Sequence, residues 1–422
     1  MKNIVICCDW IHNEIGQNIS NVLSLYLCLH KREHQSPQIA YYDPGVGTLA
    51  RPNPWRRLAQ DFTTILGLAT GYALDDHVLA AYNFLVNNYE DGDAIYLFGF
   101  SRGGFSVRVL AGLIHNVGLI WPDQANLAGS VLSAYKQSLG LGARTAWLNS
   151  LTHSANPNEK QLASEQNDHA KQLAALLSTR LPSIRFVGVF DSVASAVVPR
   201  PDRLYWPSLE EPAFTLHNPS IEIFRQAISI DERRAMFRLC KYEEPQIFLR
   251  NRAPNGSKGD PQDILQVWFA GVHSDIGGGY PEAESAIAKY PLIWMLDEAR
   301  KFGLALNEES VKQLAWGIQR NDSTLKQTAP DFAGCIHDSL TRSWRIPEYL
   351  PKSVRHKEWP ERKSHYGFYI PDGEPRLIPD DALIHESVVK RMDAILDYRP
   401  TNLPKRFGTF PMPTAPDRLR TT

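Results

Sequence analysis

The stretch "IYLFGFSRGGF", residues 95–105, decides the fold class of this chain. The apolar run over residues 95–100 ends in Gly99-x-Ser101-x-Gly103, and an amphipathic pattern follows over residues 102–116. A strand that turns sharply into a helix needs glycine on both sides of the turn, because the neighbouring backbones come close there. The pattern therefore predicts a strand, a tight turn at Ser101 and a helix.

Other apolar runs repeat this strand signal along the chain. Each is rich in β-branched or aromatic residues and shows little polar alternation, which is typical of strands covered on both faces. Helical patterns separate them, including one over residues 75–89. Alternating strands and helices predict an α/β fold with a mostly parallel central sheet flanked by helices. The expected strands lie at residues 4–8, 39–42, 95–100, 184–190 and 265–272.

The composition is that of an ordinary globular protein, with 422 residues of which 43% are hydrophobic and 22% charged. The formal net charge of -1 argues against a nucleic-acid partner held by bulk electrostatics. Five cysteines without C-x-x-C spacing fit a reducing compartment and no thiolate metal site. The apolar run in the start "MKNIVICCDW" meets Asp9 too soon to form the core of a signal peptide, and no apolar run is long enough for a transmembrane segment. We expect a cytoplasmic protein.

Two stretches break the alternation of strands and helices, at about residues 119–180 and 197–220. Both follow strands that end in candidate site residues, so we expect both to be cap insertions on a single domain spanning residues 1–422. The alternative is that they are surface insertions away from any site.

Polar residues of reactive kinds stand at the ends of the expected strands. They are Asp9, Asp43, Ser101, Asp191 and His273. In parallel sheets, functional residues gather beyond the carboxyl ends of the strands. Asp is also common in ordinary turns, and that reading suits Asp43 well.

Ser101 is the candidate nucleophile, because its turn has the strand before it and the helix after it that a nucleophile elbow requires. The alternative is a structural serine. Gly99 and Gly103 would support the turn, and the backbone N–H of Arg102 would act as an oxyanion donor at the helix N-terminus.

A serine nucleophile needs a base that a third group orients. Asp191 ends "RFVGVFDSVAS" and His273 ends "LQVWFAGVHSDIGGGY", which gives the order Ser, Asp, His seen in α/β-hydrolases. The alternatives are a helix cap for Asp191 and a structural role for His273, with His385 as the reserve candidate for the base. Asp275 could support the site or only its own loop. No cofactor is required.

Several weaker signals predict helix starts. "SIDERR" at residues 229–234 matches a capping box. His337 and His385 each precede residues that suit the beginning of a helix, and the last helix is expected near residues 384–396.

Five motifs together resemble one known family. They are "LFGFSRGGFSVRVLAGLI", "VGVFDSVAS", "SIDERRAMF", "VWFAGVHSDIGGGY" and "YRPTNLP". They are similar to the α/β-hydrolase-like domain family that includes the catalytic domain of type VI secretion phospholipase effectors. The resemblance implies a serine esterase or lipase that acts on acyl esters, with phospholipids as the best-known substrate class. Carried across by motif, the catalytic triad is Ser101, Asp191 and His273.

The chain departs from the family pattern at two places. The family often has Asp-Gly-Thr after its first strand, where this chain has Asp9-Trp10-Ile11, so Trp10 takes the place of the second oxyanion donor. Gln226 stands where the family usually has a histidine. The resemblance also implies peripheral membrane contact, an immunity or adaptor protein as a partner, and export by a type VI secretion system.

Two other functions remain open at this point. One is a metal-dependent hydrolase with Asp9, Asp191, His273 and Asp275 as ligands at the same sheet edge. The other is a catalytically inactive binding module with a hydrolase fold, which the bulky Trp10 favours.

Overall fold

A parallel sheet forms the centre of the computed structural model, which describes residues 1–9, 18–31, 37–45, 72–138, 170–193, 196–199, 207–210, 216–250, 259–319, 326–354, 357–414 and 416. The strand order is β14-β13-β10-β7-β4-β3-β1-β2. Every neighbouring pair is parallel. The strands are β1 (Asn3–Cys8), β2 (Gln38–Asp43), β3 (Ala94–Phe100), β4 (Ile184–Phe190), β7 (Ile221–Ser229), β10 (Asp263–Phe269), β13 (Leu383–His385) and β14 (Gly408–Phe410).

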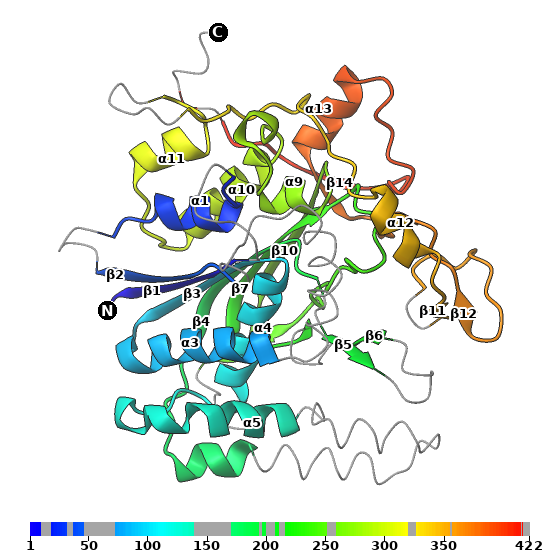
Figure 1. Ribbon diagram of the computed structural model, residues 1–422. Coiled ribbons are helices and arrows are strands. Elements are labelled where there is room, and N and C mark those ends of the chain that lie inside the picture. The colour runs from blue at the N-terminus through cyan, green and yellow to red at the C-terminus, as the bar shows by residue number, and fades with distance from the viewer. Residues whose placement is uncertain are drawn as a thin grey trace, which may run out of the picture.

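Helices cover both faces of the sheet (Figure 1). One face carries α3 (Tyr72–Asn88) and α4 (Arg102–Asn116), with α5 (Ala128–Ser138) packed outside them. The other face carries α1 (Asn21–Cys28), α10 (Lys289–Lys301) and α11 (Glu308–Leu314). The predicted class is thereby confirmed: an α/β-hydrolase-like fold with a mostly parallel central sheet flanked by helices.

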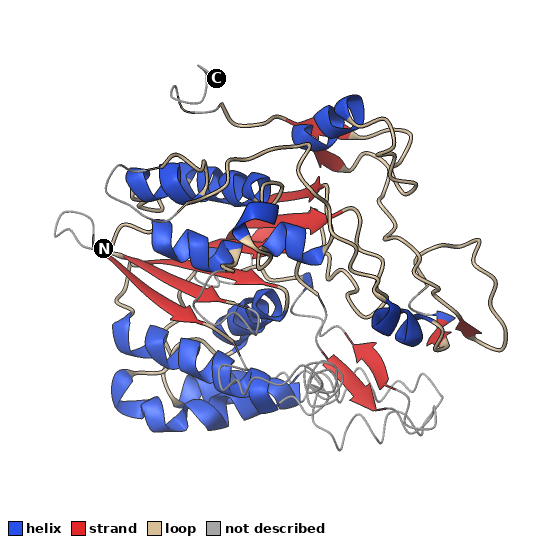
Figure 2. Ribbon diagram, turned by 45° about the horizontal axis from the view of Figure 1, so that its top comes forward, coloured by secondary structure: helices blue, strands red, loops and turns tan. Residues whose placement is uncertain are grey.

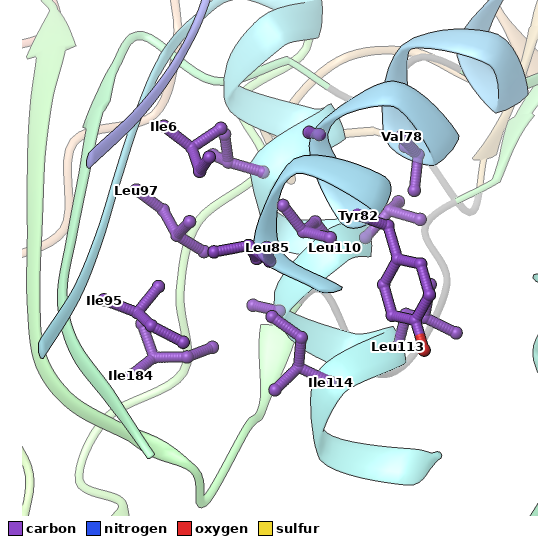
Figure 3. Packing of buried hydrophobic residues seen from close by; sticks show 14 of the residues in the cluster. Ile6, Val78, Tyr82, Leu85, Ile95, Leu97, Leu110, Leu113, Ile114 and Ile184 are labelled. Carbon is purple, nitrogen blue, oxygen red and sulfur yellow. The ribbon is translucent and has the colours of Figure 1, made fainter. Parts of the chain in front are cut away.

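The burial of the strands on both faces explains their unbroken apolar runs. Successive side chains of a strand point to opposite faces. In β3, Ile95 and Leu97 face the core under α3 and α4, while Tyr96 and Phe98 face the core under α1 and α10. Figure 3 shows the first of these cores, where Leu85 of α3 lies against the sheet. No alternating polar face is needed because neither face meets water.

The five strands predicted from the sequence are all present, and the predicted helices at residues 75–89 and 102–116 correspond to α3 and α4. The fifth strand ends at Phe269, earlier than expected. Strand β7 was not predicted, and it lies between β4 and β10 at the middle of the sheet. The expected helix start at Ser229 is wrong, because Ser229 is the last residue of β7 and residues 230–234 form bends and irregular backbone rather than a helix.

The two expected cap insertions are described only in part. In the first, residues 119–138 and 170–180 are described: the η2 turn (Pro122–Leu127) and α5 pack against α3, and Leu119 pairs with Arg180. In the second, β5 (Ala196–Pro199) and β6 (Pro207–Glu210) form a separate antiparallel hairpin. Residues 139–169, 200–206 and 211–215 lie outside the described part. The covering role of both insertions stays a prediction.

The C-terminal part of the chain adds β13, β14 and α13 (Glu386–Ala394) at one end of the sheet, and a projecting segment with α12 (Arg342–Glu348), as Figures 1 and 2 show. His385 caps α13, as predicted, whereas residues around His337 form no helix. No helix in the described residues is long and apolar enough to span a membrane. The remaining elements are β8 (Ile247–Phe248), β9 (Asp260–Pro261), α9 (His273–Gly277), η5 (Glu282–Glu284), β11 (Lys352–Ser353) and β12 (Phe368–Tyr369).

Candidate active site

Ser101 occupies a strained turn between β3 and α4, at the carboxyl edge of the sheet. Its backbone has φ 56° and ψ -119°, a region that costs a residue other than glycine on the order of 1–3 kcal/mol. A Cβ atom at Gly99 would lie 2.5 Å from the carbonyl oxygen of Gly103, and one at Gly103 would lie 2.1 Å from the carbonyl oxygen of Cys8. Glycine is therefore required at both positions so that α4 can pack this close to β3 and β1.

Asp191 follows the end of the neighbouring strand β4 and is fully buried. Its N–H donates to the carbonyl oxygen of Ala227, which continues the pairing of β4 with β7. The N–H and hydroxyl groups of Ser229 donate to Asp191 Oδ1 at 2.9 and 3.1 Å. Residues 191–193 form a bend and a bridge rather than a helix. The helix-cap alternative for Asp191 is therefore wrong.

His273 begins α9 (His273–Gly277), and three residues separate it from Phe269, the last residue of β10. Its Nε2 lies 2.7 Å from Ser101 Oγ, and its Nδ1 lies 2.5 Å from Asp191 Oδ2. The ring packs between Phe100 and Phe237, each with a centroid separation of 4.8 Å. The structure thus brings the three sequence-predicted candidates Ser101, Asp191 and His273 into one hydrogen-bonded line.

The surroundings of this line set its protonation states. Burial raises the pKa of Asp191, but the charge of Arg376 and the hydrogen bond from His273 outweigh burial and hold that pKa well below its usual range. Burial lowers the pKa of His273, and the bond to Asp191 offsets this only in part. At neutral pH the site therefore holds an ionised Asp191 and a neutral His273, which can accept a proton on Nε2.

Two charged residues that the sequence reasoning did not select lie directly against the site. Both guanidinium Nη atoms of Arg376 contact the Asp191 carboxylate, at 2.5 and 3.1 Å. Glu232 accepts the backbone N–H of His273 at 3.2 Å and is itself paired with Arg234. Burial raises the pKa of Glu232, and Arg234 more than reverses this, to about 2. Glu232 belongs to the "SIDERR" motif, whose interpretation as a helix start concealed this contact.

Of the two candidate oxyanion donors, Arg102 and Trp10, the structure describes Arg102. Arg102 is the first residue of α4, so its N–H lies at the positive end of the helix dipole beside Ser101. Trp10 lies outside the described residues. The assignment of both residues stays a prediction.

Asp275 supports the loop that carries His273. Its Oδ2 accepts the N–H groups of Val272 at 2.9 Å and of His337 at 3.2 Å. Its Oδ1 lies 2.7 Å from Nδ1 of His337, whose ring stacks on Tyr280. Asp275 thus ties α9 to the 331–340 segment, and these side-chain hydrogen bonds go to Val272 and His337 rather than to Ser101 or His273.

The aspartates proposed as metal ligands face separate partners. Asp9 accepts hydrogen bonds from the hydroxyl groups of Ser20 and Tyr42. Across the part of the chain that the structure describes, no three His, Cys, Asp or Glu side chains gather as a metal site would require. The geometry gives the metal-dependent alternative no ligand set within these residues.

The reserve histidine, His385, lies elsewhere. Its ring is buried against Phe269, and its Nδ1 contacts the hydroxyl of Ser387 at 2.8 Å. Burial lowers its pKa to about 3. His385 is a cap of α13 and not the partner of Ser101.

Comparison with known proteins bears on this arrangement. The family described as the catalytic domain of Tle1-like phospholipase effectors of the type VI secretion system matches residues 2–298. The chain belongs to this family. The match includes Ser101, Asp191 and His273 and ends 78 residues before Arg376, and it supports a hydrolase of the phospholipase or esterase type.

Relatives of known sequence or structure extend the comparison. The chain is 34% identical to a Saccharomyces cerevisiae protein described as uncharacterized protein YEL023C, over 96% of this chain and 81% of that one. A crystal structure of an uncharacterized protein from Pseudomonas aeruginosa is 16% identical with a TM-score of 0.35, over 72% of this chain and 46% of that one. The Tle1 effector bound to the VgrG spike is 17% identical with a TM-score of 0.31, over 68% of this chain and 52% of that one. The chain thus spans about half the length of these solved proteins.

Proposed function

We propose that this chain is a serine esterase of the phospholipase type, with Ser101 as nucleophile, His273 as general base and acid, and Asp191 as the group that orients His273. The observation that carries the proposal is the 2.7 Å separation of Ser101 Oγ from Nε2 of His273, a buried histidine whose pKa is lowered by burial. Such a separation lies within the reach required for proton transfer.

The reaction would proceed in two acyl-transfer steps. Ser101 Oγ attacks the carbonyl carbon of the ester while His273 Nε2 takes the hydroxyl proton, which forms a tetrahedral oxyanion. Collapse of this intermediate breaks the bond to the alcohol, and His273 returns the proton to the leaving oxygen. Water then attacks the acyl-serine by the same route and releases the fatty acid and Ser101.

Asp191 stabilises the imidazolium that forms during both steps. Its bond to Nδ1 fixes the tautomer in which Nε2 is free to accept the serine proton. The N–H of Arg102 would donate to the oxyanion from the first turn of α4, where the helix dipole favours negative charge. The Trp10 N–H is the second donor that we assign.

The substrate class and the partners follow from family membership alone. We assign acyl esters, with phospholipids first, as substrates and no cofactor. Contact with a membrane surface, an immunity or adaptor protein, and export by a type VI secretion system remain predictions of the family resemblance. No nucleic-acid partner is expected for a chain with a net charge of -1.

A fluorophosphonate probe tests the proposal without knowledge of the substrate. Attack by Ser101 Oγ forms an oxygen–phosphorus bond and expels fluoride, so mass spectrometry should find the adduct on the peptide that contains Ser101. A panel of p-nitrophenyl esters and phospholipid vesicles, run with and without a chelator, should then reveal ester hydrolysis that chelation leaves intact. A folded protein without an adduct on Ser101 would contradict the proposal.

Asp191→Asn should lower the rate of ester hydrolysis by up to about ten-thousandfold, because the amide favours the wrong tautomer of His273. The same change removes the carboxylate charge that forms the direct ion pair with the buried Arg376. We therefore expect the free energy of unfolding to fall by about 3–5 kcal/mol, as for other broken buried ion pairs. Rates measured below the unfolding transition, together with denaturant unfolding, separate the two effects. A variant that loses stability but keeps its rate would restrict Asp191 to a structural role.

A further inference from the structure

Arg376 forms a two-point contact with the carboxylate of Asp191, the group that also binds His273. Its Nη1 lies 2.5 Å from Oδ1 and its Nη2 lies 3.1 Å from Oδ2, so the guanidinium fork spans both oxygens. The remaining contacts of Oδ1 come from Ser229, and the remaining contact of Oδ2 is Nδ1 of His273. A bidentate fork fixes the rotation of a carboxylate about its bond as well as its charge.

Arg376 is itself held in place from several directions. Its Nη2 donates to the carbonyl oxygen of Phe237 at 2.6 Å, and its Nη1 donates to the hydroxyl of Ser229 at 2.7 Å. Its own carbonyl oxygen accepts a bond from Asn402 at 3.0 Å. Residue 376 is only 4% exposed. These contacts and this burial hold the guanidinium in a fixed orientation against Asp191.

We propose that Arg376 is a positioning residue for the esterase reaction: it aims Oδ2 of Asp191 at Nδ1 of His273 and keeps that carboxylate ionised. The inference rests on the proposed function. Because Arg376 lies beyond residues 2–298, the part of the chain that matches the catalytic-domain family would be completed by a segment outside it. The burial of the pair makes this contribution large, since buried charges are weakly screened.

The charged groups that face Asp191 and His273 determine how the pKa values of these two residues depend on Arg376. His273 faces Asp191 and Glu232, which raise its pKa, and Arg234, which lowers it. Arg376 faces Asp191, Glu232 and Glu358. Arg376 and His273 both contact Oδ2 of Asp191, so loss of the positive charge of Arg376 should raise the pKa of Asp191 directly and that of His273 through weaker repulsion of the imidazolium. A reaction that requires neutral His273 would then begin to lose rate at a higher pH, as the pH is lowered, than in the unaltered protein.

The test is the rate of fluorophosphonate labelling of Ser101 as a function of pH, in the full chain. In Arg376→Gln we expect the acid limb of the profile to move upward by about one pH unit. We also expect the plateau rate to fall by roughly ten- to a hundredfold, because the carboxylate is no longer aimed. Arg376→Lys keeps the charge and loses the fork, so its limb should stay in place while its plateau falls.

Arg225→Gln is the matched control. Arg225, on strand β7, is also a buried arginine that pairs with two carboxylates, those of Glu298 and Asp263. Its loss should lower the unfolding temperature while leaving the limb where it is. A change of packing alone would therefore alter stability in both variants but would shift the limb in neither.

The outcomes distinguish this inference from the proposed function. Failure of Ser101 to label in the unaltered protein would overturn the proposed function, and this inference with it. Normal labelling with an unmoved limb in folded Arg376→Gln would overturn the inference alone. If Arg376→Gln does not fold, Arg376→Lys decides: a plateau equal to that of the unaltered protein would show that the fork does not position Asp191.

Discussion

Ser101→Ala is expected to abolish ester hydrolysis, with a loss on the order of a millionfold in kcat, as in the triad deletions of a well-studied serine protease. The alanine has no oxygen to form the acyl intermediate, and water would have to attack without covalent help. The strained backbone at φ 56° persists in alanine, so the fold and its stability should change little. The measurement is the hydrolysis of the best ester from the panel, with circular dichroism and thermal unfolding as checks on the fold.

Ser106→Ala provides the control for Ser101→Ala. Ser106 is a buried serine on the same helix α4, and its hydroxyl donates to the carbonyl oxygen of Arg102 rather than to His273. Its removal should cost only the energy of one hydrogen bond, about 1 kcal/mol of stability. Retention of most activity in folded Ser101→Ala would remove Ser101 from the mechanism.

His273→Ala is expected to lose activity nearly as completely as Ser101→Ala. Without Nε2 at 2.7 Å, no base accepts the serine proton and no acid protonates the leaving alcohol. Because the two residues act as a unit, the double variant Ser101→Ala/His273→Ala should be little worse than either single variant. Steady-state rates of the three variants provide the comparison.

His385→Ala is the matched control for the histidine. Its ring is as buried as that of His273, but it packs against Phe269 and not against Ser101. Loss of activity in His385→Ala with a normal unfolding temperature, alongside activity in His273→Ala, would overturn the assignment of the base. If the rate losses of Ser101→Ala and His273→Ala multiplied in the double variant, Ser101 and His273 would instead act independently.

Much of the sheet and the candidate residues could be predicted from local sequence. The apolar run before Ser101 and the paired glycines predict the strand, the turn and the helix because all three depend on neighbouring residues. Asp191 and His273 were selected because each follows a strand, and parallel strands bring their carboxyl ends to one edge. These features are local in origin, so a single sequence contains them.

Strand β7 was missed because its polar residues interrupt the apolar run. Arg225 lies in the middle of the strand, yet it is buried because Glu298 and Asp263 from other elements pair with it. From the sequence alone, an arginine at this position predicts an exposed side chain, because its two partners are not evident. The pairing depends on the assembled sheet and on α10, which the local pattern does not contain.

The sequence by itself determined the class of sheet, the turn at Ser101 and the order in which the three candidate residues occur. Only the tertiary structure decided that His273 rather than His385 lies beside Ser101, and that Arg376 lies against Asp191. Asp191 and Arg376 are 185 residues apart in the chain. No periodicity or turn signal links residues so distant, because an ion pair of this kind forms only when packing buries both groups and leaves each as the other's partner.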